Sequence, residues 1–124
     1  MKPVLVVDDE AIVRESIRDW LKNSGYQVSV AESGEDALKQ IEKKNFGVMI
    51  LDLRLPGING IEVLKKVKAL KPEIKSIVIT AYPTMLSQEE ATKLGAIDYL
   101  VKPVFPDKLE ALIEETLGKA EAEK

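Results

Sequence analysis

Near its amino terminus the chain reads Val4-Leu5-Val6-Val7-Asp8-Asp9-Glu10, four consecutive apolar residues followed by three acidic ones. A strand that is apolar on consecutive positions is buried on both faces, as in a parallel sheet covered by helices. Four more short runs rich in Val and Ile follow, at Gln27–Val30, Val48–Leu51, Ser76–Thr80 and Ile97–Val101. The sequence therefore predicts five strands, most of them inside a parallel sheet.

Between these runs, apolar residues recur at spacings of three and four, which is typical of helices with one buried face. The stripes are Val13, Ile17, Trp20 and Leu21; Ala37, Leu38 and Ile41; Val63, Leu64, Val67 and Leu70; and Leu109, Leu112, Ile113 and Leu117. The stripe near 87–94 is weaker and predicts a loosely packed helix. Strand and helix alternate, so the predicted fold is α/β: an open, doubly wound five-stranded parallel sheet with helices on both faces.

Polar residues at cap positions predict where the helices begin. Ser33 is a predicted N-cap. Capping-box spacing is found for three pairs, Asn59 with Glu62, Ser87 with Glu90, and Asp107 with Glu110. Trp20 and Met85 are interpreted as core or near-core residues rather than cofactor contacts.

Composition excludes several classes of function. The 124 residues suit one domain, and 18 basic against 21 acidic residues give a net charge of −3, which disfavours direct nucleic-acid binding. With no cysteine and no histidine, the chain has no thiolate catalysis, no Ser-His triad and no cysteine or histidine metal ligand. We find no membrane span or signal peptide and expect a cytoplasmic protein.

The ends of the predicted strands carry the polar residues that point to a function. In strand order 2-1-3-4-5 the first and third strands are neighbours, so Asp8, Asp9 and Asp52 converge on one crevice, with Thr80 and Lys102 on its other wall. Clustered carboxylates repel one another unless a cation joins them, and oxygen ligands suit Mg²⁺. Asp52 can act as a nucleophile in aspartyl-phosphate chemistry, and Thr80 can donate one hydroxyl proton to a phosphoryl oxygen.

These motifs resemble the receiver (response-regulator) domains of two-component signalling, over nearly the whole chain. The matching pieces are the acidic pair in V-V-D-D-E, the strand end L-D-L-R-L-P-G-I-N-G, the tripeptide I-T-A and the segment D-Y-L-V-K-P. The resemblance implies a flavodoxin-like (βα)5 fold with strand order 2-1-3-4-5. The receiver domain is expected to span residues 1–118, with 119–124 a frayed tail or the stub of a linker.

The resemblance also implies residue roles, again as expectations. Asp52 accepts the phosphoryl group and binds Mg²⁺ directly together with Asp9 and the backbone carbonyl of Arg54, while Asp8 acts mainly through water. Lys102 binds the phosphate, and its peptide bond to Pro103 is cis. Thr80 and Tyr99 form the switch pair.

The implied function is a phosphorylation-activated switch. Without histidine, the chain needs a separate histidine kinase or phosphotransfer protein as its donor. The chain would catalyse its own phosphorylation and dephosphorylation without being a turnover enzyme. Phosphorylation would reshape a face built from the fourth helix, the fifth strand and the fifth helix, which controls an output protein or domain. Whether the chain stands alone or fronts a longer transcriptional regulator, and whether it dimerises when phosphorylated, stays open.

Two bulky residues are expected to shield the phosphoryl group from water. Arg54 lies two positions after Asp52, and Tyr82 lies two after Thr80, whereas Ala81 keeps the entrance small-walled. We predict that Arg54 and Tyr82 lengthen the lifetime of the phosphorylated form.

Two other functions on a related fold are weighed against this one. A flavodoxin-like cofactor binder needs a phosphate loop after the first strand, where Asp8, Asp9 and Glu10 would repel a phosphate. A Mg²⁺-dependent phosphohydrolase with an aspartyl intermediate needs a second Asp at the position of Arg54.

Overall fold

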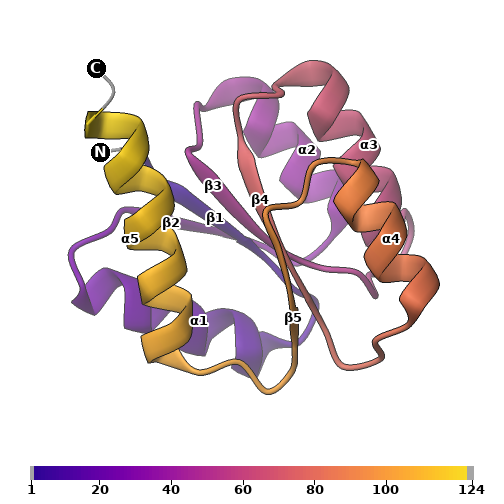
Figure 1. Cartoon of the computed structure of the whole chain (residues 1–124), viewed down its shortest axis with the longest axis horizontal. Coiled ribbons are helices and arrows are strands. Elements are labelled where there is room, and N and C mark those ends of the chain that lie inside the picture. Colours follow the sequence, from indigo (N-terminus) through magenta and orange to yellow (C-terminus); the bar gives the residue numbers. More distant parts are fainter. Residues whose placement is uncertain (1, 123–124) are drawn as a thin grey trace.

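The computed structural model describes residues 2–122, and its helices lie on both faces of a five-stranded sheet (Figure 1). In chain order the elements are β1 (Val4–Val7), α1 (Ala11–Asn23), β2 (Val28–Ala31), α2 (Gly34–Lys43), β3 (Val48–Asp52), α3 (Gly60–Leu70), β4 (Lys75–Thr80), α4 (Met85–Lys93), β5 (Asp98–Val101) and α5 (Pro106–Ala122). Every predicted strand is present, and no strand boundary differs from its prediction by more than one residue.

The strands run parallel in the order β2-β1-β3-β4-β5, which confirms the predicted fold and topology. The register places Val7 of β1 beside Leu51 of β3, and Thr80 of β4 beside Val101 of β5. The residues that follow these four strand ends therefore meet at one edge of the sheet. None of the helices described within residues 2–122 is long and apolar enough to cross a membrane.

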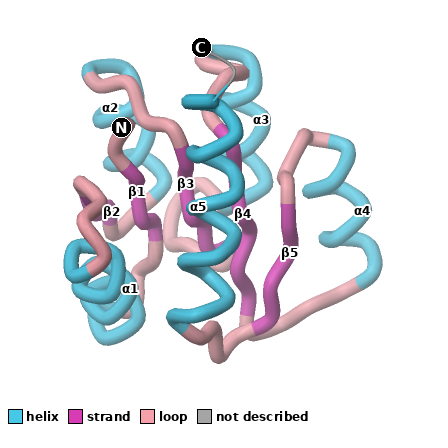
Figure 2. The backbone as a smooth tube through the Cα atoms, turned by 60° about the vertical axis from the view of Figure 1, so that its left-hand side comes forward, coloured by secondary structure: helices cyan, strands magenta, loops and turns pink. Residues whose placement is uncertain are grey.

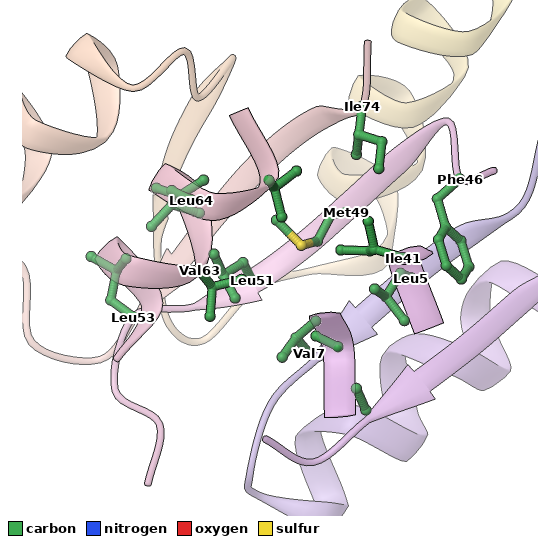
Figure 3. Close-up of a cluster of buried hydrophobic side chains, with 14 of the residues drawn as sticks. Leu5, Val7, Ile41, Phe46, Met49, Leu51, Leu53, Val63, Leu64 and Ile74 are labelled. Atoms are coloured by element: carbon green, nitrogen blue, oxygen red, sulfur yellow. The ribbon is translucent and has the colours of Figure 1, made fainter. Parts of the chain in front are cut away.

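Alternate residues of each central strand enter different layers of the core. In β1, Val4 and Val6 pack with α1 and α5, while Leu5 and Val7 pack with α2 and α3. Figure 2 shows α5 in front of the sheet with α3 behind it, and Figure 3 shows part of the second layer, where Leu5 and Val7 lie near Ile41 and Met49. Burial of both faces is why these strands read as continuous apolar runs.

Two of the four predicted helix starts are correct. The side chain of Ser33 accepts a hydrogen bond from Asp36 N at 3.1 Å, and that of Asn59 accepts one from Glu62 N at 3.0 Å.

The other two predicted starts are wrong. Helix α4 begins earlier than Ser87, because the Thr84 side chain already accepts a hydrogen bond from Ser87 N at 3.0 Å. Helix α5 begins at Pro106 rather than after Asp107, since a proline fits the first helical position, where its missing N–H is not needed.

Trp20 packs against the core layer of α1 and α5, as interpreted from the sequence, whereas Met85 does not. Met85 opens α4 and leaves 80% of its surface exposed, so its interpretation as a near-core residue is wrong. Ala91 is the one buried residue within α4, in line with the weak stripe of this segment.

The expected tail at 119–124 falls partly on α5, which is assigned through Ala122, and partly on 123–124, which lie outside the described residues. The domain boundary at residue 118 stays a prediction.

Gly60 allows α3 to begin directly against the carboxyl end of β3. Its backbone N–H donates a hydrogen bond to the carbonyl of Leu53 at 3.0 Å. A Cβ atom at this position would lie 2.5 Å from Leu53 Cα and 2.7 Å from the Asp52 carbonyl oxygen. These are backbone atoms, so the overlap cannot be relieved by turning a side chain, and glycine is required here.

We predict that Gly60→Ala lowers the free energy of unfolding by about 2–3 kcal/mol, the cost of overpacking a closely packed site. Gly118→Ala is the matched control, because a Cβ there meets no atom within 4 Å and alanine favours the helix by about 0.5–1 kcal/mol. Urea unfolding of both variants measures the two effects. Equal stabilities for Gly60→Ala and the wild type would contradict the prediction.

Candidate functional site

Lys102 is the centre of the polar cluster at the carboxyl edge of the sheet. It follows β5, and its peptide bond to Pro103 is cis, as predicted. Its ammonium nitrogen lies 2.9 Å from Asp8 Oδ2, 2.9 Å from Glu10 Oε1 and 2.9 Å from Asp52 Oδ2. Burial lowers the pKa of Lys102, but its contacts with the three carboxylates raise that pKa by more, so the ammonium stays charged.

Asp52 is the last residue of β3 and is 97% buried. One carboxylate oxygen, Oδ1, accepts a hydrogen bond from Arg54 N at 3.0 Å, and the other, Oδ2, accepts one from Lys102 at 2.9 Å. Both oxygens are therefore oriented by groups from separate elements. An oriented carboxylate beside a fixed cation is suited to nucleophilic attack on an anion.

Asp8 follows β1 and is fully buried. Its Oδ1 accepts a hydrogen bond from Glu10 N at 2.9 Å, whereas Oδ2 makes an ion pair with Lys102 but no hydrogen bond. Burial raises the pKa of Asp8 to about 6, and the charge of Asp52 acts in the same direction. The ionised carboxylate is thus held at a cost in free energy.

Three carboxylates approach closely enough to share one ion, but they are not the three expected from the sequence. Within the described part of the chain, ligand oxygens of Asp8, Glu10 and Asp52 all lie within 4.8 Å of one another. Asp9 is exposed and is not a member of this group, so its role as a metal ligand stays a prediction. The same holds for the backbone carbonyl of Arg54.

Glu10 is the site residue that sequence reasoning missed. It immediately precedes α1, and its backbone carbonyl accepts the hydrogen bond of Arg14 N at 3.0 Å. The available signal was the third acid of Asp8-Asp9-Glu10, but the direction of a side chain at a helix start cannot be read from the sequence. The longer side chain of Glu10 reaches back over the site to Lys102.

The other walls of the site come from β4 and the loop after it. Thr80 is 99% buried, and its hydroxyl oxygen accepts a hydrogen bond from Tyr82 N at 3.1 Å. The Thr80 carbonyl accepts a hydrogen bond from Lys102 N at 2.8 Å, which ties this strand end to the lysine. The predicted convergence of Thr80 and Lys102 on one edge is therefore observed.

Tyr99 lies on β5, and its side chain is half-buried. Its hydroxyl is 2.6 Å from Ser87 Oγ and accepts a hydrogen bond from Thr84 N at 3.4 Å. Thr84 and Ser87 form the first turn of α4, so a side chain of β5 is bonded to the start of that helix.

Arg54 and Tyr82 contact each other at the mouth of the site. The guanidinium carbon lies 4.3 Å from the centre of the tyrosine ring, within the range of a cation–π interaction. Tyr82 is 65% exposed, and Ala81 beside it is also exposed. A pocket of about 440 Å³ lies between α1 and the segment after β5, and its lining includes Ala81, Glu10 and Lys102.

The residues fit a hard divalent cation. Three carboxylates face one ammonium, which leaves two negative charges in excess when all are ionised. Asp8 Oδ2 is buried without a hydrogen bond, and the side-chain donor set consists of oxygen alone. Oxygen ligands at an anionic site favour ions such as Mg²⁺ over softer metals.

Comparison with known proteins places this geometry among receiver domains. The sequence profile of the response regulator receiver domain family matches residues 4–114. The transcriptional regulatory protein ZraR of Escherichia coli is 40% identical over 119 residues, covering 93% of this chain and 26% of ZraR. The transcriptional regulatory protein FixJ of Bradyrhizobium diazoefficiens is 35% identical over 118 residues, covering 95% of this chain and 58% of FixJ. The chain spans about a quarter of ZraR and somewhat more than half of FixJ.

Solved structures of response regulator receivers are similar to this chain. A CheY-like response regulator receiver domain protein from Methanospirillum hungatei JF-1 has a TM-score of 0.95 at 33% identity, over 100% of this chain and 99% of that one. The response regulator TrrA from Thermotoga maritima, solved in complex with Mg²⁺-BeF, has a TM-score of 0.84 at 37% identity, over 94% and 99%.

The raised pKa of Asp8 predicts a pH-dependent gain in stability for Asp8→Asn when a chelator is present. The pKa of Asp8 in the folded protein, about 6, exceeds the ordinary 3.8. Protonated Asp8 therefore contributes fully to the free energy of unfolding of the wild type below pH 4, and this contribution is lost as the pH rises through about 6. From pH 4 to pH 7 the stability of Asp8→Asn relative to the wild type should rise, by at most about 3 kcal/mol.

Urea unfolding across this pH range measures the difference. Asp9→Asn is the matched control, because it removes the same charge from the exposed neighbouring side chain. Parallel pH profiles for Asp8→Asn and Asp9→Asn would contradict the prediction.

Proposed function

The chain belongs to the response regulator receiver domain family, and we propose that it is a phosphorylation-controlled signalling switch with Asp52 as the phosphoryl acceptor. The observation that carries the proposal is the arrangement of Asp52, a buried carboxylate oriented by Arg54 N and held 2.9 Å from Lys102 Nζ. Attack of a carboxylate on an anionic phosphoryl group is favoured by a fixed positive charge beside the nucleophile.

The proposed phosphoryl donor is a phosphohistidine that lies outside these 124 residues, because they contain no histidine. A histidine kinase or phosphotransfer protein presents a phosphohistidine, and an oxygen of Asp52 attacks phosphorus in line. The new bond joins Asp52 oxygen to phosphorus, the bond from phosphorus to imidazole nitrogen breaks, and the nitrogen keeps its electron pair. A small acyl phosphate serves equally, with its carboxylate as the leaving group.

The protein contributes positioning and charge rather than proton transfer. Lys102 offers its ammonium to an equatorial phosphoryl oxygen, and Thr80 has a hydroxyl proton to donate, since its oxygen accepts from Tyr82 N. Asp8, Asp9 and Asp52, with the backbone carbonyl of Arg54, are the proposed ligands of Mg²⁺. When bound, this ion offsets negative charge on the transferred group.

The switch is proposed to run from Thr80 to Tyr99 and then to α4. Movement of Thr80 toward the phosphoryl group frees space that the Tyr99 ring enters, and this movement breaks the bonds of the Tyr99 hydroxyl with Ser87 and Thr84. The start of α4 is thereby released. Phosphorylation shifts the balance between the two arrangements by the difference in its interaction free energy with each.

The proposed output surface is the face of α4, β5 and α5. These elements and the loops next to them expose five large apolar side chains: Met85 (80%), Leu86 (67%), Ile97 (42%), Val101 (51%) and Phe105 (66%). Exposed apolar side chains suit an output protein or domain, or a second phosphorylated copy, more than nucleic acid. We further propose that the chain works in the cytoplasm and fronts a longer regulator, as its 26% coverage of ZraR suggests.

We predict that incubation with Mg²⁺ and acetyl phosphate adds one phosphoryl group, measured as intact mass. Asp52→Asn should abolish the gain because it removes the nucleophile. Asp19→Asn, which makes the same change at an exposed position on α1, should keep it. A gain that persists in Asp52→Asn would refute Asp52 as the acceptor.

We also predict that Arg54→Ala and Tyr82→Ala each accelerate loss of the phosphoryl group, by roughly twofold to fivefold, the equivalent of one exposed cation–π contact. Because the two side chains touch each other, the double variant should lose phosphate little faster than either single variant. The measurement is phosphate release over time, with Lys66→Ala on the exposed face of α3 as the control. Unchanged lifetimes would remove the shielding role.

A further inference from the structure

The ammonium of Lys102 is already surrounded by carboxylates in this structure. It donates hydrogen bonds to Glu10 Oε1 and Asp52 Oδ2, each at 2.9 Å, and makes an ion pair with Asp8 Oδ2 at 2.9 Å. The proposed function requires the same ammonium to bind an oxygen of the transferred phosphoryl group. A phosphoryl oxygen that approaches this ammonium therefore competes with the carboxylates already in contact with it.

The three partners differ in what they lose on release. The Asp8 side chain is fully buried and that of Asp52 is 4% exposed, so each would become an unpaired charge away from water. The Glu10 side chain is 60% exposed and can exchange the ammonium for water at little cost. Glu10 is therefore the partner that can leave.

The backbone around Glu10 allows its side chain to move alone. Glu10 N donates a hydrogen bond to Asp8 Oδ1 at 2.9 Å, and Glu10 O accepts one from Arg14 N at 3.0 Å. The side chain makes no cap hydrogen bond to α1, so its release leaves the helix start intact. The neighbouring pocket of about 440 Å³, bordered by Glu10, Ile12 and Ala81, gives it room to turn.

We propose that Glu10 is a positioning residue that holds Lys102 over the site in the unphosphorylated protein and competes with the phosphoryl group for its ammonium. This inference rests on the proposed function and assigns Glu10 a role within the same site. Glu10 acts as an internal competitor, so the wild-type protein needs more phosphoryl donor to reach a given rate than a variant without this carboxylate.

The test is the rate of phosphorylation by acetyl phosphate at Mg²⁺ concentrations that saturate each variant. Asp52 oxygen forms the bond to phosphorus, and acetate leaves with the electron pair of its P–O bond. Glu10→Gln should lower the donor concentration at half-maximal rate by roughly 1.4-fold to fivefold, the range of one exposed ion pair, with a smaller change in maximal rate.

Two further variants separate contact from charge. Glu10→Asp keeps the charge but is one methylene shorter and cannot span the 2.9 Å contact, so it should shift the half-saturation in the same direction as Glu10→Gln. Glu15→Gln removes a charge from an exposed position on α1 and should match the wild type. Urea unfolding checks that all variants are folded.

An unchanged or raised half-saturation in Glu10→Gln overturns the inference, as does a wild-type response in Glu10→Asp. A crystal structure of the fluoroberyllate-bound protein gives a second measurement, in which the Glu10 carboxylate is expected to have left Lys102 and a retained ion pair overturns the inference. If the wild type takes up no phosphoryl group at all, the proposed function itself fails. Normal uptake with an unaffected Glu10→Gln refutes only the role of Glu10.

Discussion

One ammonium shared among three carboxylates is the interaction on which the site depends. Lys102 lies 2.9 Å from oxygens of Asp8, Glu10 and Asp52, which arrive from the ends of two strands and the start of a helix. Repulsion among the acids is offset by a single positive charge, and the cluster keeps an excess of negative charge. This excess suits a cation site, and the charge of Asp52 adds to the effect of burial, which is the main cause of the raised pKa of Asp8.

The sheet makes this concentration of charge possible. Parallel strands in the order β2-β1-β3-β4-β5 put the ends of β1, β3, β4 and β5 at one edge, while apolar side chains above and below the strands supply the packing. The polar residues sit just past the strands, where the chain leaves the core. The buried apolar layers stabilise the fold, so the polar residues at the carboxyl edge of the sheet do not have to contribute to packing.

Much of this was predictable from the sequence, and the failures have physical causes. Strands buried on both faces produce continuous apolar runs, so their positions were predicted to within one residue. The sequence predicted that Asp52 and Lys102 lie at the carboxyl edge of the sheet, because both stand at the ends of strands. Glu10 was not, since the direction of a side chain after a turn depends on tertiary contacts. The start assigned to Ser87 failed because Thr84, three residues earlier, offers the same kind of cap.

Helix α4 has one buried residue, Ala91, and its first turn is bonded to β5 through the Tyr99 hydroxyl. Ala91 is the one residue that α4 contributes to the buried core layer of α2 and α3. Few buried apolar contacts are a physical basis of low local stability, and local opening of such segments falls on the microsecond-to-second scale. In the proposed switch, free energy supplied at the sheet edge has to redistribute only this one element, while the rest of the fold serves as a fixed frame.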